Sequence, residues 1–193
     1  MKSLHRVHEA EDYSEEFEID LYANYLQKLQ ERYQKYNYSD LPGASGVYDN
    51  LVFRLKAYEK GDRGITRVIH GDPVLTNILV NNFGKIKFID MRGKVGSKLT
   101  IRGDEIYDWA KLYQSLIGYD EILMSKQISE EYRSSMLSIF WKTLSVLNTD
   151  IRESDVRLIT ASLFFSLIPL HTAQDEMHKQ ELYLQMGNRL VME

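Results

Sequence analysis

The sequence contains no cysteine and no long apolar segment, and each absence removes a class of function. Without cysteine, its 193 residues cannot form disulfides, thiolate metal sites or a cysteine nucleophile, which favours a cytoplasmic protein. The first residues, MKSLHRVHEAEDYSEEFE, contain no apolar stretch of the kind found in a signal peptide. The longest apolar run, residues 158–170, is interrupted by hydroxyl side chains and is shorter than the roughly 20 residues that span a bilayer. We therefore expect a buried helix there and no membrane span.

An excess of positive charge is missing as well. The chain carries 24 lysines and arginines against 28 acidic residues, a formal net charge of -4. Broad binding to nucleic acids usually requires a basic face, so nucleic acid is not an expected partner. The hydrophobic content of 44% and the charged content of 27% are ordinary for a globular protein. The length fits one domain, residues 1–193.

Helical periodicity dominates both ends of the chain. Asp12 and Glu15 resemble a capping box, after which apolar and aromatic side chains recur at helical spacing as far as Tyr36. A Pro- and Gly-containing loop at 39–46 follows. Further helices are expected at 47–60, from Asp104 to Gly118, at 129–147, at 154–168, and from about 172 to the end. In the helix at 129–147 the expected inward side chains are Tyr132, Met136, Ile139, Phe140, Leu144 and Leu147.

The middle of the chain has a different character. Short β segments are expected at 67–70, 78–80 and 85–90, and the sequence Asn-Asn-Phe-Gly at 81–84 supplies a turn between the last two. A Gly- and Lys-rich loop at 93–103 follows. The sequence thus predicts an α-rich α+β fold, in which helices surround a small β insert.

Polar residues that could bind magnesium lie at the ends of these β segments, in VIHGDPVLTNILVNNFGKIKFIDMRG. Asp72 and Asn77 are separated by a short loop, and Asp90 ends an apolar strand. A carboxylate in that position is costly unless it has a partner, and Mg²⁺ prefers carboxylate and phosphate oxygens. The alternative is that all three residues serve in turns and caps, where Asp and Asn are common.

The segment HGDPVLTNIL resembles the aminoglycoside phosphotransferase and choline kinase family, whose fold is similar to that of protein kinases. The later segment IDMRGKVGSKLTIRGDEIYDWAKLYQSL resembles the second signature of that family, in particular the branch found in capsule and surface-sugar biosynthesis. The resemblance implies a protein-kinase-like C-terminal lobe, helical with a small β insert that carries the catalytic loop. It also implies that SLHRVHE, near the start, is the first helix after the hinge.

The resemblance implies a function and a role for each site residue. The function is an ATP- and Mg²⁺-dependent transfer of phosphate to a hydroxyl of a small molecule, with a sugar or capsule precursor favoured over a choline-like alcohol or an aminoglycoside. Asp72 is the catalytic residue, and Asn77 and Asp90 hold the Mg²⁺ that bridges the ATP phosphates. His70 is a structural member of the catalytic loop, which Asp108 supports from the following helix.

A basic loop follows the proposed metal ligand. Arg92 and Lys94, with Lys98 and Arg102, could contact phosphate or an anionic acceptor, and a solvated loop is an equal alternative. The other histidines have no spacing typical of a metal site, and we expect them on the surface or in packing; they are His5, His8, His171 and His178.

The resemblance covers only one lobe of the family. A complete enzyme also has an upstream β lobe with a phosphate-covering loop and a lysine paired to a glutamate, whereas residues 1–66 have the pattern of helix, loop and helix. We therefore expect a fragment or domain of a longer enzyme, with a missing N-terminal lobe or a fused domain as its partner. The alternative is a non-catalytic kinase-like module that binds a ligand or another protein.

Overall fold

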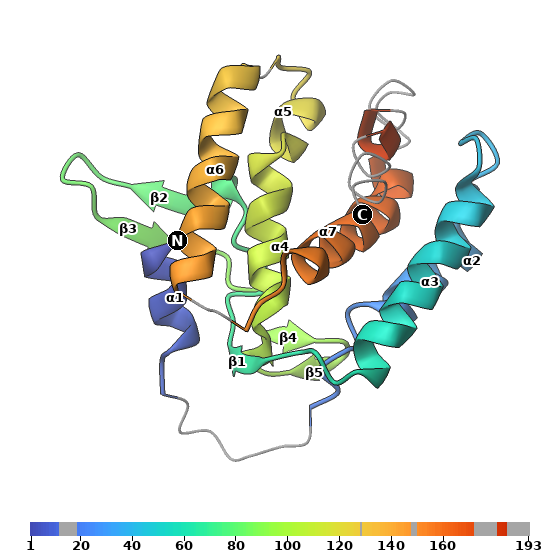
Figure 1. Cartoon of the computed structure of the whole chain (residues 1–193), viewed down its shortest axis with the longest axis horizontal. Helices are drawn as coiled ribbons and strands as arrows, with labels where there is room; N and C mark the ends of the chain where they lie inside the picture. Colours follow the sequence, from blue (N-terminus) through green and yellow to red (C-terminus); the bar gives the residue numbers. More distant parts are fainter. Residues whose placement is uncertain (12–18, 128, 148–149, 172–180, 185–193) are drawn as a thin grey trace.

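The computed structural model describes residues 1–11, 19–127, 129–147, 150–171 and 181–184, which form an α-rich α+β fold (Figure 1). The helices are α1 (Lys2–His8), α2 (Leu26–Lys35), α3 (Ala44–Lys60), α4 (Glu105–Leu116), α5 (Tyr119–Leu123), α6 (Glu130–Leu147) and α7 (Glu153–Leu167), with 3-10 turns η1 (Leu75–Asn77) and η2 (Ile168–His171). The strands are β1 (Thr66–Val68), β2 (Ile78–Val80), β3 (Ile86–Phe88), β4 (Lys94–Val95), β5 (Lys98–Leu99) and β6 (Arg102–Asp104). They pair as β1 with β6, β2 with β3, and β4 with β5, all antiparallel.

The centre of the molecule is the packing of α4 on α7. Nearly all of α4 and most of α7 are buried, so polar residues there need partners inside the protein. Thr160 of α7 finds two, because its Oγ1 lies 2.7 Å from the carbonyl oxygen of Val156 and 3.2 Å from that of Ala110 in α4. The predicted buried helix is therefore confirmed. Among the described residues, no helix is both long and apolar enough to cross a membrane.

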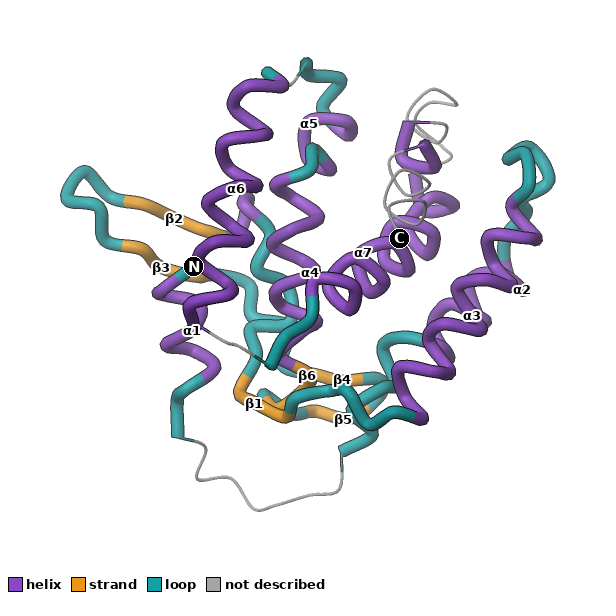
Figure 2. The backbone as a smooth tube through the Cα atoms, viewed as in Figure 1, coloured by secondary structure: helices purple, strands orange, loops and turns teal. Residues whose placement is uncertain are grey.

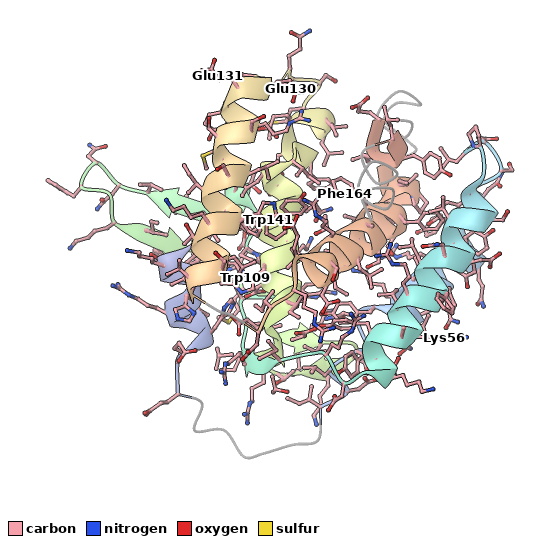
Figure 3. The ribbon with its side chains drawn as sticks, viewed as in Figure 1. Lys56, Trp109, Glu130, Glu131, Trp141 and Phe164 are labelled. Atoms are coloured by element: carbon pink, nitrogen blue, oxygen red, sulfur yellow. The ribbon has the colours of Figure 1, made fainter. Side chains whose placement is uncertain are left out.

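Two further layers cover this pair, as the tube in Figure 2 shows. On one side α6 packs against α4, where Trp109 and Trp141 lie close to the helix contact and Phe164 comes from α7 (Figure 3). On the other side α2 and α3 pack against α7. The ring of Tyr38 stacks on Phe165 of α7 with centroids 4.6 Å apart, and its hydroxyl donates to the Phe165 carbonyl oxygen.

The β2–β3 hairpin stands away from the helices and has the predicted turn (Figure 1). The side-chain Oδ1 of Asn81 accepts hydrogen bonds from the backbone N–H groups of Phe83 (3.0 Å) and Lys85 (2.9 Å). Gly84 has a φ of 72°, a conformation that most other residues avoid. The polar turn chemistry read from the sequence is thus the chemistry that closes this hairpin.

The helix expected to begin near Asp12 and the loop expected at 93–103 differ from the sequence-based predictions. The described chain forms turns at 21–25 and α2 begins only at Leu26; the expected start at Asp12 lies outside the described residues. Tyr25 sits at the N-cap position of α2, and from there its hydroxyl reaches the buried Asp104 at 2.6 Å, a long-range contact that helical periodicity does not indicate. The predicted loop at 93–103 contains the short strands β4 and β5 and the start of β6.

Part of the predicted inward face of α6 is also wrong. Phe140 and Leu144 are buried as expected, but Tyr132 is 57% exposed and Ile139 is 56% exposed. The reason is that α6 packs mainly against α4, so only one narrow stripe of the helix is covered. Ile139 instead lines an apolar groove of about 400 Å³ between α6, α1 and the β2–β3 hairpin. The helix expected after residue 172 lies largely outside the described residues.

Asp104 connects four segments of the fold. Its Oδ1 accepts from the backbone N–H groups of Ile106 (3.1 Å), which caps α4, and of Ile65 (3.0 Å), which precedes β1. Its Oδ2 accepts from the hydroxyls of Tyr25 (2.6 Å) and Tyr58 (2.5 Å), on the segments of α2 and α3. Burial raises the pKa of the Asp104 carboxyl, and these hydrogen bonds oppose the shift by stabilising the charged form.

We predict that Asp104→Ala lowers the free energy of unfolding by about 3 kcal/mol, because it leaves several buried donors without an acceptor. Tyr58→Phe is the matched control, since it removes one donor and keeps the ring; it should cost about 1 kcal/mol. Urea denaturation followed by circular dichroism measures both. An Asp104→Ala loss no larger than that of Tyr58→Phe would contradict a role of Asp104 as a connecting residue.

Candidate functional site

The HGD loop, residues His70–Asn77, is held by the side chain of Asp108 in α4. The two carboxylate oxygens of Asp108 accept from the backbone N–H groups of His70 (2.7 Å) and Gly71 (2.8 Å). Gly71 has a φ of 82°, and a Cβ there would lie 2.7 Å from the Cβ of Arg92. A side chain at this position is therefore excluded twice, by conformation and by space. The glycine of the motif allows the loop to pass close to the chain after β3.

Two more side chains of α4 contact the same loop. Lys111 Nζ lies 2.9 Å from Oδ1 of Asp72, and Ser115 Oγ accepts from the backbone N–H of Leu75 at 3.1 Å. With Asp108, these residues have the spacing i, i+3 and i+7, which places them on one face of a helix. α4 therefore positions the HGD loop along its length. The side chain of Asp72 remains 39% exposed at the end of this row, so it can be reached from solvent.

His70 is buried in the loop and has a structural environment. Its Nδ1 faces the backbone N–H of Asp72 at 3.3 Å, and its carbonyl oxygen accepts from the N–H of Arg92 at 2.9 Å. Its ring lies 5.5 Å from that of Phe88. Within the described part of the chain, the other ring nitrogen, Nε2, has no hydrogen-bond partner. The contacts of His70 thus connect the HGD loop to β3 and to the residues after it.

Asn77 links the HGD loop to the segment that precedes Asp90. Its side-chain Nδ2 donates to the carbonyl oxygen of Asp72 (3.0 Å), and its own carbonyl oxygen accepts from the N–H of Ile89 (3.0 Å). Asp90 directly follows Ile89, so all three predicted site residues lie at the base of the β2–β3 hairpin. Because Nδ2 is used inside the loop, Oδ1 is the atom that Asn77 can offer to a ligand.

Asp90 has an exposed side chain and a backbone φ of 57°. Left-handed conformations cost non-glycine residues roughly 1–2 kcal/mol, although Asp tolerates them better than most. Such strain is concentrated at functional sites. The oxygen donors of Asn77 and Asp90 are of the type that Mg²⁺ prefers, so the residues present fit this ion.

The predicted basic residues Arg92 and Lys94 lie beside the site. Arg92 donates from a guanidinium N–H to the hydroxyl of Tyr107 at 2.9 Å, while Lys94 begins β4 and is exposed. Burial would raise the pKa of Tyr107, but the positive charges of Lys28, Lys111 and Arg92 lower it instead. A positive potential therefore extends from the HGD loop to α2.

One of the remaining histidines is not a simple packing residue. His8 of α1 is buried, with Nε2 3.1 Å from Oδ2 of Asp108 and Nδ1 3.2 Å from Oε1 of Glu105. Both nitrogens face carboxylates, which suits the doubly protonated ring. Burial lowers the pKa of His8, but its hydrogen bonds to the carboxylates of Asp108 and Glu105, with their negative charges, outweigh burial and raise the pKa overall. The side chain of His171 and the whole of His178 lie outside the described residues.

His5, His8 and Glu105 also form the one described group of His, Asp and Glu side chains whose ligand atoms all lie within 4.8 Å of one another. Such a group could hold a transition metal. In this structure, however, His8 is an ion-pair partner of Glu105, and Arg67 of β1 approaches the second oxygen of Glu105 at 3.8 Å. These contacts account for the cluster as a connection between α1, β1 and α4.

Lys111 is a residue of the candidate site that the sequence-based reasoning did not assign. It stands in the segment GDEIYDWAKL, three residues after Asp108, and a lysine on a helix with so many apolar neighbours is unusual without a partner. The available signal for Lys111 was its position three residues after Asp108, on the same helix face as a residue expected to support the HGD loop.

Comparison with known proteins gave no relative. No family model, curated protein or solved structure matches this chain. The function must therefore be inferred from the chemistry of the site.

We predict that His8→Gln removes a pH-dependent contribution to stability. The pKa of His8 is raised in the folded state, so its stabilisation is complete below about pH 6.5 and disappears as the pH rises through the folded-state pKa. The free energy of unfolding of the wild type should exceed that of the variant by more at pH 6 than at pH 8.5. Denaturant titrations across this pH range measure the difference. A constant difference would contradict the prediction.

Proposed function

We propose that this chain is the protein-kinase-like C-terminal lobe of an ATP- and Mg²⁺-dependent phosphotransferase that acts on a hydroxyl group of a small molecule. The observation that carries the proposal is the pair of contacts made by Asn77, which ties the backbone of Asp72 to the strand that ends at Asp90. The side chains of these residues, two from one loop and the third from the end of a strand, can therefore converge at one edge of the β2–β3 hairpin, which supports the proposal. Phosphoryl transfer requires mainly positioning and charge neutralisation, which such an edge can supply.

Asp72 would act on the acceptor. The acceptor oxygen attacks the γ-phosphorus of ATP, the bond from that phosphorus to the β–γ bridging oxygen breaks, and ADP leaves. The proton of the acceptor hydroxyl passes to the carboxylate of Asp72. A positioned general base of this kind contributes roughly 10²–10⁴-fold to a rate. Lys111 fixes the orientation of Asp72 through their 2.9 Å ion pair, and Asp108 fixes the loop that carries it.

Asn77 and Asp90 would hold the magnesium ion, which would neutralise negative charge on the ATP phosphates. Asn77 is suited to this role because its Nδ2 is engaged within the loop and its Oδ1 is left for a ligand. The left-handed backbone of Asp90 is compatible with this role, since Asp is among the few residues that tolerate this conformation.

A second candidate function is a non-catalytic module that binds a ligand or another protein. The observation in its favour is the ion pair of Asp72 with Lys111, which engages the carboxylate that a catalytic base needs. Against it stands the gathering of Asp72, Asn77 and Asp90, for which a binding module has no chemical need. The two candidates differ in whether phosphate is transferred.

We predict that the chain binds ADP only with Mg²⁺ and that Asp90→Asn weakens this binding at least about tenfold, because a charged ligand is lost. Asn tolerates the left-handed conformation, so the variant should fold. Asp62→Asn is a matched control, since Asp62 is also exposed and has a positive φ of 46°. Calorimetric titration with and without EDTA measures all three proteins. Equal binding by Asp90→Asn and the wild type would exclude Asp90 as a metal ligand.

We predict that Asp72→Asn reduces phosphate transfer by about 10²–10⁴-fold while Mg²⁺·ADP binding is preserved. Incubation with γ-labelled ATP and a pool of sugars, sugar phosphates and amino alcohols, followed by separation of labelled products, measures the transfer. If the wild type binds Mg²⁺·ADP but labels nothing in the pool, the binding-module candidate is favoured.

A further inference from the structure

A basic cavity of about 660 Å³ lies between α2 and the β4–β5 hairpin. Its volume is in the range of small-molecule binding sites. Five cationic side chains line it: Lys28, Arg32, Arg92, Lys94 and Lys98. Two carboxylates, Asp20 and Glu31, line it as well, which gives the described lining a net charge of +3, whereas the whole chain has a net charge of -4. Positive charge is therefore concentrated at one place on an acidic protein.

The two carboxylates of the cavity are engaged locally. Oδ1 of Asp20 accepts from the backbone N–H of Tyr22 at 3.1 Å, and Oε1 of Glu31 accepts from Nε2 of Gln27 at 2.9 Å. The cations act on one another: burial lowers the pKa of Lys28, the interaction with Tyr107 raises it, and the charges of Arg92, Lys111 and Arg32 lower it. Like charges brought together in this way repel, and a bound anion would relieve the repulsion.

The basic cavity adjoins the HGD loop. Arg92 lines the cavity with its side chain, while its backbone N–H donates to the carbonyl oxygen of His70 at 2.9 Å. The hydroxyl of Tyr107 holds the Arg92 guanidinium at 2.9 Å, and this fixes one cation of the lining in advance of any ligand. Lys111, which pairs with Asp72, belongs to the same group of interacting charges around Tyr107. A molecule in the cavity would thus lie beside the catalytic carboxylate.

We propose that the acceptor is an anionic sugar, phosphorylated or carboxylated, whose negative group binds in the basic cavity while a hydroxyl faces Asp72. This inference rests on the proposed function and narrows it. Of the acceptor classes compatible with a hydroxyl phosphotransferase, cationic ones such as aminoglycosides and choline-like alcohols would be repelled by a lining with a net charge of +3. A neutral sugar would gain nothing from these cations. Phosphate and carboxylate are the groups that arginine and lysine bind best.

The anion in the basic cavity could belong to the acceptor or to the nucleotide, because the phosphates of the nucleotide carry the same kind of negative charge. The two cases make different predictions. If the cavity holds nucleotide phosphates, a sugar phosphate and Mg²⁺·ADP compete for it. If it holds the acceptor, both bind at once. Whether a sugar phosphate and Mg²⁺·ADP compete for binding therefore decides between the two sources.

The test is a calorimetric titration of the chain with glucose 6-phosphate, glucose and glucosamine, which share one ring and differ in charge, and with inorganic phosphate. We expect glucose 6-phosphate to bind at least about tenfold more tightly than glucose, and glucosamine to bind no better than glucose. The same titration in the presence of saturating Mg²⁺·ADP should give an unchanged affinity. Equal affinities for the three sugars, or loss of glucose 6-phosphate binding when Mg²⁺·ADP is added, would overturn the inference.

Matched variants locate the bound anion. Lys28→Gln and Arg32→Gln should each weaken glucose 6-phosphate binding about fivefold or more, since each removes a charge from the lining. Lys56→Gln removes the same charge from the exposed face of α3 (Figure 3) and should leave the affinity unchanged. An equal effect of all three would mean that only net charge matters, which would also overturn the inference.

Failure of this inference can be told from failure of the proposed function. Binding of Mg²⁺·ADP that depends on Asp90, together with no preference for glucose 6-phosphate, rejects the anionic acceptor alone. Binding of glucose 6-phosphate that depends on Lys28 and Arg32, together with no binding of Mg²⁺·ADP, supports the anion site and rejects the phosphotransferase.

Discussion

The structure depends on the burial of three carboxylates in the first turn of α4. Asp104, Glu105 and Asp108 are each no more than 2% exposed. A carboxylate removed from water costs several kcal/mol unless charges or hydrogen bonds replace the lost solvent. Each of these residues therefore requires partners from elsewhere, and the segments that supply them are brought to the same end of one helix. The negative charges also lie at the positive end of the α4 dipole, which reduces the cost.

The partners of these carboxylates define most of the architecture. Asp104 takes hydroxyls from the α2 and α3 segments, and Asp108 takes two N–H groups of the HGD loop. His8 pairs with Glu105 and Asp108 together and so fixes α1. The strands add little rigidity by themselves, since none has more than three residues. The geometry of the candidate site is consequently set by α4, which lies beneath the HGD loop. Substitutions in α4 should therefore alter the position of Asp72.

Local parts of this arrangement could be predicted from the sequence. The cap of α4 at Asp104, the turn at Asn81 and the buried helix α7 follow from short-range chemistry that a few neighbouring residues specify. A role of Asp108 in supporting the HGD loop was implied only by family resemblance; in the structure its carboxylate accepts from the backbone N–H groups of His70 and Gly71.

The features that escaped prediction are contacts across long stretches of chain. His8 and Asp108 are 100 residues apart, and nothing near His8 indicates a carboxylate partner. Lys111 meets Asp72 only because the loop lies along α4, and the hydroxyl of Tyr25 reaches Asp104 from the N-cap position of α2. In each case a polar group that looks like surface or packing in the sequence is needed to satisfy a buried charge. Hydrophobic periodicity cannot reveal such pairing, because it indicates which face of a helix is apolar and not which residues contact that helix.

The buried carboxylates beneath the HGD loop and the cations of the basic cavity have different surroundings, and this difference bears on ligand binding. Beneath the HGD loop, the buried carboxylates are met by histidine, hydroxyls and backbone N–H groups within the protein. At the basic cavity, Lys28 is surrounded by like charges: Arg92 and Arg32 of the lining, and Lys111 nearby, disfavour its charged form. Cations gathered in this way repel one another. The anionic ligand that we propose for the basic cavity would offset this repulsion, as the internal partners offset the cost of burying the carboxylates.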